Sequence, residues 1–456
     1  MDKINLKIKR SIMFWSKLAI LMIQVGMYAW LWYNHYKDIM PRQYWHKGNW
    51  AIVGLYFVLL YFFSKEFGAL KVGYLKTWDV MYSQIFSIIC VNGITYLQLA
   101  LINGDWALFE HFGPIFCLSV VDLLVVFVWA FLMRYVYAVL YPPHEMLLIY
   151  QDIDPKHLEE KLNKRPDKYL IKDKIQIHDN LDDVLSKLDG QESVIIADVP
   201  SHERNAIIKY CYERGIRCYG IPKISDIMIR YSDDIDLFDT QLLLFRNGGL
   251  TYRQAIVKRG VDIMISLLAT VILSPLFLII AIAIKSYDGG PVFYKQKRLT
   301  KDGVEFDILK FRSMIVESEK NGARLAKADD DRITPVGKVL RRTHCDELPQ
   351  IFNILKGDMS VVGPRPERKE IADEYKKEIP EFDFRLRVKA GLTGYAQVYG
   401  NYATTPLDKL KLDLTYISHY SLWLDIKLIV LTAKIVFAKE KSEGVDNSQK
   451  TALKNK

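Results

Sequence analysis

Long apolar segments constrain this chain of 456 residues more than any other feature. Four of them lie close together, near residues 11–32, 49–64, 80–103 and 113–141. A helix needs about 20 apolar residues to cross a bilayer, and these segments approach or exceed that length. The second is short and rich in aromatic side chains, so whether it spans fully stays open. We therefore expect a multi-pass membrane protein.

Basic residues around these segments predict their orientation. Lys7, Lys9 and Arg10 precede the first segment and Lys65, Lys71 and Lys76 follow the second. The 104–112 loop has neither Lys nor Arg. Basic loops are retained on the cytoplasmic side of a membrane. We place the N-terminus, the 65–79 loop and everything after the fourth crossing in the cytoplasm.

Overall charge and the spacing of the cysteines limit which partners and which disulfide or metal sites are expected. The net charge of +9 suggests a partner rich in phosphate, such as a lipid headgroup, a nucleotide or a nucleic acid. The five cysteines form no CxxC pair and no compact cluster with histidine. We expect neither a disulfide framework nor a zinc site.

The segment from 144 to 250 reads as an α/β domain. Short apolar strands are expected at 145–150, 193–199 and 216–222, and a helix at 202–215 ends at a glycine. Alternation of strands and helices predicts a small parallel sheet. The first strand leads into a turn without the glycines that cradle a pyrophosphate. The domain is therefore Rossmann-like in shape, with no nucleotide-binding motif.

A fifth apolar segment, residues 260–284, is long enough to span a bilayer. Ser274 and Pro275 lie in its middle, and a proline there removes one backbone hydrogen bond and bends the helix. Lys and Arg flank it at both ends, which suits a segment that enters and leaves by the same face. Hydropathy alone favours a proline-kinked spanning helix, since proline is tolerated in such helices. The motifs that follow favour a re-entrant helix.

An adjacent acidic pair, Asp346-Glu347, lies among cationic residues. Acidic residues and a following proline are typical of a helix start, which is one interpretation. The other divides the pair between a nucleophile that attacks phosphorus and a ligand for a divalent cation. Neighbouring arginines are expected to keep the nucleophile ionised. A phosphate substrate also needs several fixed cations, and four are available: Lys310, Arg312, Arg341 and Arg365.

Three motifs follow the apolar segment in a fixed order: KRLTKDGVEFDILKFRSM, RRTHCDELPQIFNILKGDMSVVGPRPE and GLTGYAQVYG. In this order, after a helix broken by Ser-Pro, they resemble the bacterial sugar transferase family. These are monotopic polyprenyl-phosphate phosphoglycosyl transferases. The similarity covers about residues 255–440. The four preceding apolar segments and the Rossmann-like domain are similar to the larger members, which initiate capsule, exopolysaccharide or O-antigen synthesis.

The resemblance implies a reaction and a set of roles. A sugar 1-phosphate would pass from a UDP-sugar to undecaprenyl phosphate, releasing UMP, with Asp346 as the phosphorylated nucleophile and Glu347 as the Mg²⁺ ligand. Ser274 and Pro275 match the break of the re-entrant helix. The remaining predicted substrate contacts are Lys310, Arg312, Arg341, Pro364, Arg365 and Gln397.

The complete sequence-based prediction is a membrane protein of four parts. These are a four-helix transmembrane bundle (1–143), the Rossmann-like α/β domain (144–250), an α-rich catalytic domain with a small β-hairpin and the re-entrant helix 260–284 (251–440), and a disordered tail (441–456). We expect it in the bacterial inner or plasma membrane with its catalytic domain in the cytoplasm. A homo-oligomer is left open.

Two departures from the family pattern leave the sugar unidentified. Ala390 stands where the family often has proline before GLTG, and YGNYATT replaces a stretch that commonly holds an arginine. Two other classes of function are alternatives to this enzyme. A non-catalytic membrane scaffold would release no UMP, and a nucleic-acid-binding protein would need basic patches interleaved with aromatics, which the sequence lacks. We expect no nucleic-acid partner.

Overall fold

A computed structural model provides the structure of the chain. It describes residues 6–40, 46–104, 111–151, 155–177, 181–245, 248–315, 332–400 and 404–437. The chain divides into two compact units, Met1–Ile221 and Pro222–Lys456. The predicted α/β domain was extended to residue 250, whereas residues 222–250 fold with the second unit. The predicted tail from 441 onward lies outside the described residues.

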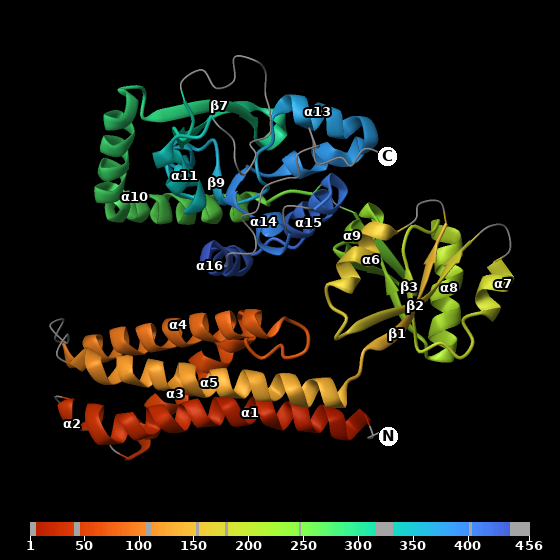
Figure 1. The fold of residues 1–456 in the computed structure, drawn as a ribbon, viewed down its shortest axis with the longest axis horizontal. Coiled ribbons are helices and arrows are strands. Elements are labelled where there is room, and N and C mark those ends of the chain that lie inside the picture. The colour runs from red at the N-terminus through yellow and green to blue at the C-terminus, as the bar shows by residue number, and fades with distance from the viewer. Residues whose placement is uncertain are drawn as a thin grey trace. The chain divides into compact units, whose positions relative to one another are not determined.

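The first unit begins with long apolar helices (Figure 1). They are α1 (Leu6–Leu31), extended by a π-helical turn (Trp32–Tyr36) and α2 (Lys37–Ile39), then α3 (His46–Glu66), α4 (Thr77–Asn103) and α5 (Phe112–Leu140). Two buried apolar clusters join residues of these helices. With α10 (Tyr252–Asp288) of the second unit, the described part of the chain has 5 helices long and apolar enough to cross a membrane. This supports the prediction of a membrane protein.

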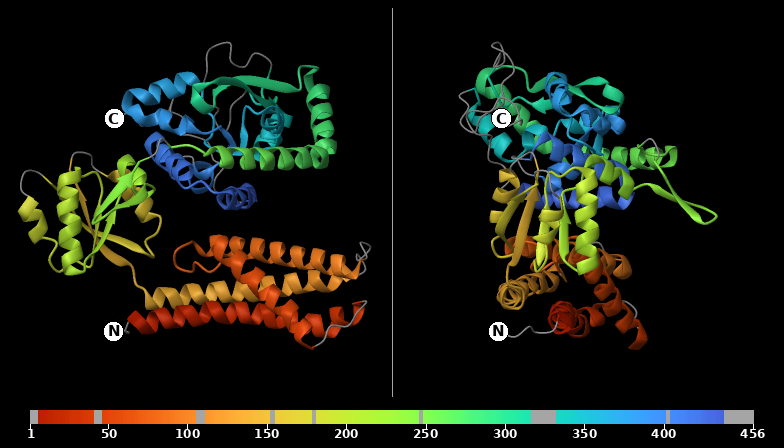
Figure 2. Two further views of the ribbon diagram at one scale, coloured as in Figure 1. Left: turned by 180° about the vertical axis from the view of Figure 1, so that it is seen from behind. Right: turned by 90° about the vertical axis from the view of Figure 1, so that its right-hand side faces the viewer.

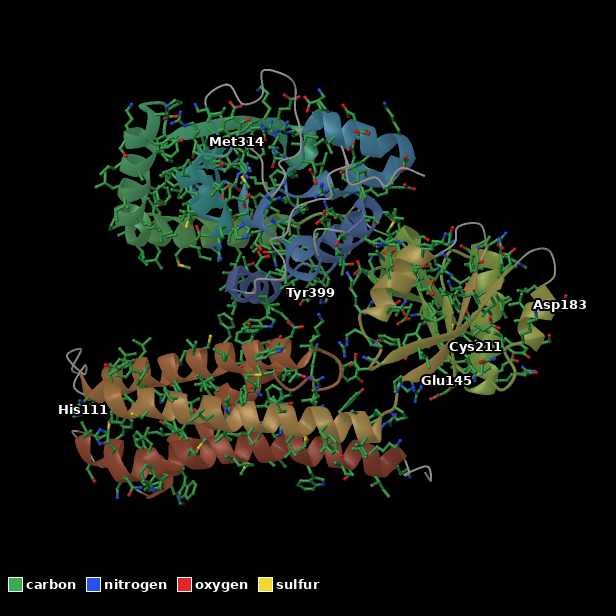
Figure 3. All side chains as sticks on the ribbon, viewed as in Figure 1. His111, Glu145, Asp183, Cys211, Met314 and Tyr399 are labelled. Carbon is green, nitrogen blue, oxygen red and sulfur yellow. The ribbon has the colours of Figure 1, made fainter. Side chains whose placement is uncertain are left out.

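A parallel α/β fold completes the first unit. Its sheet has the order β2-β1-β3-β4, and Cys211 of α8 is buried in its core (Figure 3). The predicted strands and the helix that ends at Gly215 are all present. The elements are β1 (His144–Tyr150), α6 (Lys156–Asn163), β2 (Tyr169–Gln176), α7 (Leu181–Ser186), β3 (Ser193–Ile196), α8 (Ser201–Arg214) and β4 (Arg217–Gly220).

The second unit is rich in helices around one large buried cluster. The predicted hairpin is present as antiparallel β7 and β8, and a short parallel pair joins β9 to β10. Its elements are α9 (Ile224–Arg230), β5 (Asp233–Leu237), β6 (Thr240–Leu244), α10 (Tyr252–Asp288), β7 (Phe293–Leu299), β8 (Glu305–Phe311), α11 (Pro335–Arg342), α12 (Gln350–Lys356), β9 (Ser360–Val362), α13 (Lys369–Glu378), β10 (Gly391–Thr393), α14 (Tyr395–Tyr399), α15 (Pro406–Ser418) and α16 (Leu422–Phe437).

Helix α10 is bent, with Pro275 inside it. Figures 1 and 2 show two arms that meet at a sharp corner. The Ser274 hydroxyl donates a hydrogen bond of 2.8 Å to the carbonyl of Val271.

Both arms of α10 pack on the same short helix, α12. On the first arm, the Arg259 guanidinium donates to the Leu355 carbonyl at 2.7 Å. On the second, the rings of Phe277 and Phe352 lie 5.6 Å apart. A straight helix would separate residues 259 and 277 by about 27 Å, whereas α12 is about 10 Å long. The bend therefore returns the second arm to the unit that holds the first.

Candidate active site

The acidic pair lies between two helices. Helix α11 starts at an N-cap, where the Thr334 hydroxyl accepts from the Gly337 amide at 2.9 Å. After α11 the chain turns at His344, whose φ of 56° is in the left-handed region. Asp346 and Glu347 then occupy a short 3-10 turn (Cys345–Glu347), and α12 follows after Pro349. The pair therefore precedes α12 and is not part of its first turn.

Two cations hold the carboxylate of Glu347. Its Oε1 accepts from the Lys310 ammonium at 2.7 Å and from Nη2 of Arg365 at 2.8 Å. Burial by itself raises the pKa of Glu347, but the charges of Arg365 and Lys310 outweigh it and hold that pKa well below its usual range. Arg365 is half exposed. Its guanidinium can thus reach both the carboxylate and a ligand arriving from solvent.

Asp346 is in a different electrostatic environment. Only 8% of the residue is exposed. Burial raises the pKa of its carboxyl, and this effect exceeds the opposing charges of Lys310 and Arg341. Burial therefore opposes the neighbouring cations at Asp346, because the side chain is removed from water. That these cations keep the nucleophile ionised stays a prediction. The pKa values of the two adjacent carboxyls therefore move in opposite directions, up for Asp346 and down for Glu347, as in sites where two acids have separate roles.

Arg341 and Arg312 point to different partners. Nε of Arg341 donates to the Ser313 hydroxyl at 3.0 Å, and its charge acts on Asp346. Arg312 is buried and forms an ion pair with Asp288 at the end of α10. Arg312 therefore joins the second arm of α10 to β8 in this structure, whereas Lys310, two residues earlier, faces the acidic pair.

Pro364 and Gln397 both hydrogen-bond to the backbone of β10. The Pro364 carbonyl accepts from the Gly391 amide at 2.9 Å, and the Gln397 amide donates to the Leu392 carbonyl at 3.0 Å. The Oε1 of Gln397 is buried and has no partner among the described residues.

Glycines allow the backbones around β9 and β10 to approach closely. A Cβ on Gly391 would lie 2.0 Å from the Gly363 nitrogen, and one on Gly394 2.1 Å from the Gly363 oxygen. Any side chain at these positions would push the β9 and β10 backbones apart and displace Arg365 from Glu347.

Comparison with known proteins decides the family. The family model described as "Bacterial sugar transferase" matches residues 253–439, which include the whole of this site. The UDP-glucose:undecaprenyl-phosphate glucose-1-phosphate transferase of Caulobacter vibrioides is 39% identical over 218 residues, covering 46% of this chain and 82% of that relative. The chain belongs to the bacterial sugar transferase family.

Other relatives match over a smaller part of their length. The UDP-N-acetylgalactosamine-undecaprenyl-phosphate N-acetylgalactosaminephosphotransferase of Aeromonas hydrophila is 44% identical over 40% of this chain and 44% of that relative. The UDP-glucose:undecaprenyl-phosphate glucose-1-phosphate transferase of Escherichia coli is 41% identical over 39% of each chain. The chain thus spans less than half of the length of these two bacterial sugar transferases.

Sequence reasoning missed Arg385, which positions the loop of this sugar transferase. Its guanidinium pairs with Asp413 at 2.8 Å, and both side chains are almost fully buried. Its Nη2 also donates to the backbone carbonyl of Arg365 at 2.9 Å. No spacing in the sequence signals this contact, because Arg385 is 20 residues from Arg365 and 28 from Asp413.

Arg298 is a second cation that the sequence did not single out. Burial lowers its pKa to about 10, with Glu367 opposing that effect and Arg365 adding to it. Its Nη1 donates to the Pro366 carbonyl at 3.2 Å. Arg298 and Arg385 therefore hold the Pro-Arg-Pro segment from two sides.

Glu347 and Asp346 are the candidate ligands for Mg²⁺ in this site. Among the described residues, no three His, Cys, Asp or Glu side chains gather as a metal site. Mg²⁺ in phosphate-transferring sites commonly takes one or two carboxylates and completes its shell with substrate phosphates and water. Glu347 beside Asp346 fits that pattern if the ion arrives with a diphosphate.

Proposed function

We propose that this chain transfers a sugar 1-phosphate from a UDP-sugar to undecaprenyl phosphate and releases UMP. The observation that supports this most is the arrangement of Asp346 and Glu347. One carboxyl is buried and has no cation in hydrogen-bond contact among the described residues, and its neighbour is held by two cations. The names of three relatives describe transfer to undecaprenyl phosphate, from UDP-glucose or UDP-N-acetylgalactosamine.

The reaction has two displacements at the same phosphorus. In the first, a carboxylate oxygen of Asp346 attacks the β-phosphorus of the UDP-sugar. The bond from that phosphorus to the bridging oxygen breaks, and UMP leaves with the electron pair. In the second, a phosphate oxygen of undecaprenyl phosphate attacks the aspartyl-phosphosugar, and the bond to Asp346 breaks. The products are undecaprenyl diphosphate sugar and free Asp346.

Lys310 and Arg365 have two partners in this scheme. Without ligand they neutralise Glu347, and with ligand they take the phosphate oxygens, for which the planar fork of an arginine is well shaped. Glu347 would then hold Mg²⁺, which would neutralise charge on the departing nucleotide phosphate when bound. Arg341 would contribute a further cation beside Asp346. The proposal places Arg312 in the scaffold of α10, and Pro364 and Gln397 in the support of the Arg365 loop.

The membrane arrangement belongs to the same proposal. Helices α1, α3, α4 and α5 would cross the bilayer as a bundle, with the catalytic unit on the cytoplasmic side of the inner membrane. Helix α10 would enter the cytoplasmic leaflet of that membrane and return to the same side. Its exposed apolar residues near the bend, Val271 and Ile272 among them, support this. A soluble donor and a lipid acceptor meet only at such a boundary.

Release of UMP from a panel of UDP-sugars, in vesicles containing undecaprenyl phosphate, tests the reaction and identifies the sugar. Asp346→Asn should abolish release, because the amide is not a nucleophile toward phosphorus. Asp302→Asn, in the exposed turn between β7 and β8, is the matched control and should retain full activity. With a labelled donor and no acceptor, the wild-type peptide containing residue 346 should carry the sugar phosphate.

Full turnover by Asp346→Ala would exclude the covalent mechanism. Absence of UMP release with every UDP-sugar would instead favour a scaffold role.

A further inference from the structure

One carboxyl group is buried among the N-terminal helices without a partner in the part of the chain that the structure describes. Asp122 belongs to the buried stripe of α5 and is only 1% exposed. Neither of its oxygens has a hydrogen-bond partner among the described residues. A carboxylate inside an apolar helix bundle is costly unless its charge is neutralised. Asp122 therefore needs a proton or a positive charge that no described side chain provides.

Neutral polar groups from other helices lie beside this carboxyl. The Tyr56 hydroxyl of α3 donates to the Asn92 carbonyl of α4 at 2.9 Å, and the Asn92 amide donates to the Ser119 hydroxyl at 2.8 Å. Ser119 lies one helical turn before Asp122, and the Asn92 amide is close to both. The ring of Tyr28 on α1 stacks on that of Tyr56, with 3.9 Å between their centroids. Four helices thus meet near Asp122.

A second buried group without a partner, Gln24 of α1, lies at the same level. Gln24 is 0% exposed, and neither polar atom of its amide has a partner among the residues that the structure describes. Helices α1 and α5 lie side by side in opposite directions (Figure 1), and the Trp129 indole donates to the Ser16 carbonyl at 3.2 Å. Measured from that contact, Gln24 lies about 12 Å along α1 and Asp122 about 10 Å along α5. The hydroxyl of Tyr28, one turn beyond Gln24, is also buried without a described partner.

We propose that Asp122, Gln24 and Tyr28 bind one monovalent metal cation between α1 and α5. Hard cations take oxygen ligands, and these three side chains offer a carboxylate, an amide carbonyl and a hydroxyl. One positive charge matches a single carboxylate, whereas a divalent ion would leave a net charge buried. A proton on Asp122 would also neutralise it, but the acceptors of Gln24 and Tyr28 would still have no partner. A cation held by several oxygens at once satisfies all three side chains.

The proposed cation site lies within the first unit and does not depend on the proposed transfer reaction. A ligand that binds only the folded state stabilises that state by mass action. The cation would join α1 to α5 and thereby stabilise the bundle of N-terminal helices. Sodium or potassium should therefore raise the temperature at which the chain unfolds.

Thermal unfolding of the full chain in detergent tests this site. At constant ionic strength and pH, sodium chloride or potassium chloride is exchanged separately for N-methyl-D-glucamine chloride. One or both should raise the wild-type unfolding midpoint until it saturates, and the ion that does so at the lower concentration is the preferred ligand. Asp122→Asn removes the charge and keeps the shape, so its midpoint should respond to neither ion. Asp79→Asn, in the first turn of α4, is the matched control and should respond as wild type does.

A second variant leaves the carboxyl in place. Gln24→Leu removes one oxygen ligand, so half-maximal stabilisation should need about tenfold more cation, the effect of losing one contact to a charged group. Met22→Leu, at an exposed apolar position of the same helix, should leave that concentration unchanged. This pair keeps the proposal testable if Asp122→Asn does not fold.

A wild-type midpoint that responds to neither sodium nor potassium would overturn the proposal. So would equal responses in wild type and Asp122→Asn, or in Gln24→Leu and Met22→Leu. A midpoint that changes with pH but with neither cation would overturn it in favour of a protonated carboxyl.

Discussion

The four N-terminal apolar helices and α10 look alike in sequence but are held in different ways. All have the length and composition of membrane spans, yet only 11% of the apolar window of α10 is buried, compared with 28–39% for the others. The N-terminal helices bury apolar side chains and neutral hydrogen bonds against one another. Helix α10 is fixed through polar side chains near its ends, and its apolar middle is left exposed. Apolar composition alone therefore does not determine how such a helix is anchored.

The charged anchors of α10 lie deep in the catalytic unit. Lys258 donates to Asp425 at 2.6 Å, and the Tyr416 hydroxyl donates to the same carboxylate at 2.8 Å. The Asp262 carboxylate accepts from the Val361 amide at 3.0 Å. The N-terminal helices have a neutral counterpart in Tyr56, whose hydroxyl donates to Asn92 at 2.9 Å. Substitutions at these two kinds of contact test the comparison.

Removal of the buried ammonium should have the largest effect. Lys258→Met would leave the Asp425 carboxylate buried and uncompensated, and we expect the free energy of unfolding to fall by about 3–5 kcal/mol. Denaturant unfolding of the purified chain measures this change. The double variant Lys258→Met/Asp425→Leu should recover most of the loss.

An exposed ion pair provides the control for that prediction. Lys297 lies 3.9 Å from Asp307, and both side chains are more than half exposed. Lys297→Met should therefore cost less than about 1 kcal/mol. Equal destabilisation by the two lysine substitutions would contradict the view that α10 is fixed by its buried charge.

Straightening α10 should have the second-largest effect. Pro275→Ala restores an N–H for the carbonyl of Val271 and removes the ring that deflects it. The second arm of α10, which carries Phe277 and Asp288, would then no longer pack correctly beside the candidate active site. We expect UMP release to fall about 100-fold, the scale of a small misplacement of reacting groups.

A proline in the N-terminal helices provides the contrast. Pro114 lies in the first turn of α5, where an N–H has no helical acceptor. Pro114→Ala should leave UMP release unchanged. Unchanged release in Pro275→Ala would show that the bend is not needed for transfer.

The smallest effect is expected among the N-terminal helices. Asn92→Ala removes a bond to Tyr56 and one to the Ser119 hydroxyl at 2.8 Å. Polar contacts between membrane helices contribute little each, so we expect a loss of about 1 kcal/mol in unfolding free energy. The same unfolding assay measures it. A loss as large as that of Lys258→Met would remove the distinction between the two regions.

Local patterns predicted much of the fold. Apolar runs located the long helices and alternation located the parallel α/β domain, and the predicted small hairpin of the catalytic domain is present as β7 and β8. These features depend on neighbouring residues, whose spacing the sequence displays. The hairpin of β5 and β6 was not predicted, and its residues were assigned to the α/β domain, because no core periodicity distinguishes a hairpin that no other described element covers.

The candidate site was only partly predictable, because its contacts join residues far apart in the chain. Asp346, Glu347, Lys310 and Arg365 were identified from motifs, but the partner of each was not. Arg312 was predicted to contact substrate, and its ion pair with Asp288 was not foreseen. Arg385 was not identified at all, since its hydrogen bonds join residues far apart in the chain.

By itself, the sequence of this bacterial sugar transferase determined which segments avoid water, where α10 is weakened by proline, and which residue types gather for phosphate chemistry. Each of these follows from side-chain chemistry within a few positions. Only the tertiary structure decided which cation neutralises Glu347, which way the pKa of Asp346 moves, and where the two arms of α10 attach. Those outcomes depend on burial and on charges brought together from distant parts of the chain, and electrostatic energies are set by distance in space.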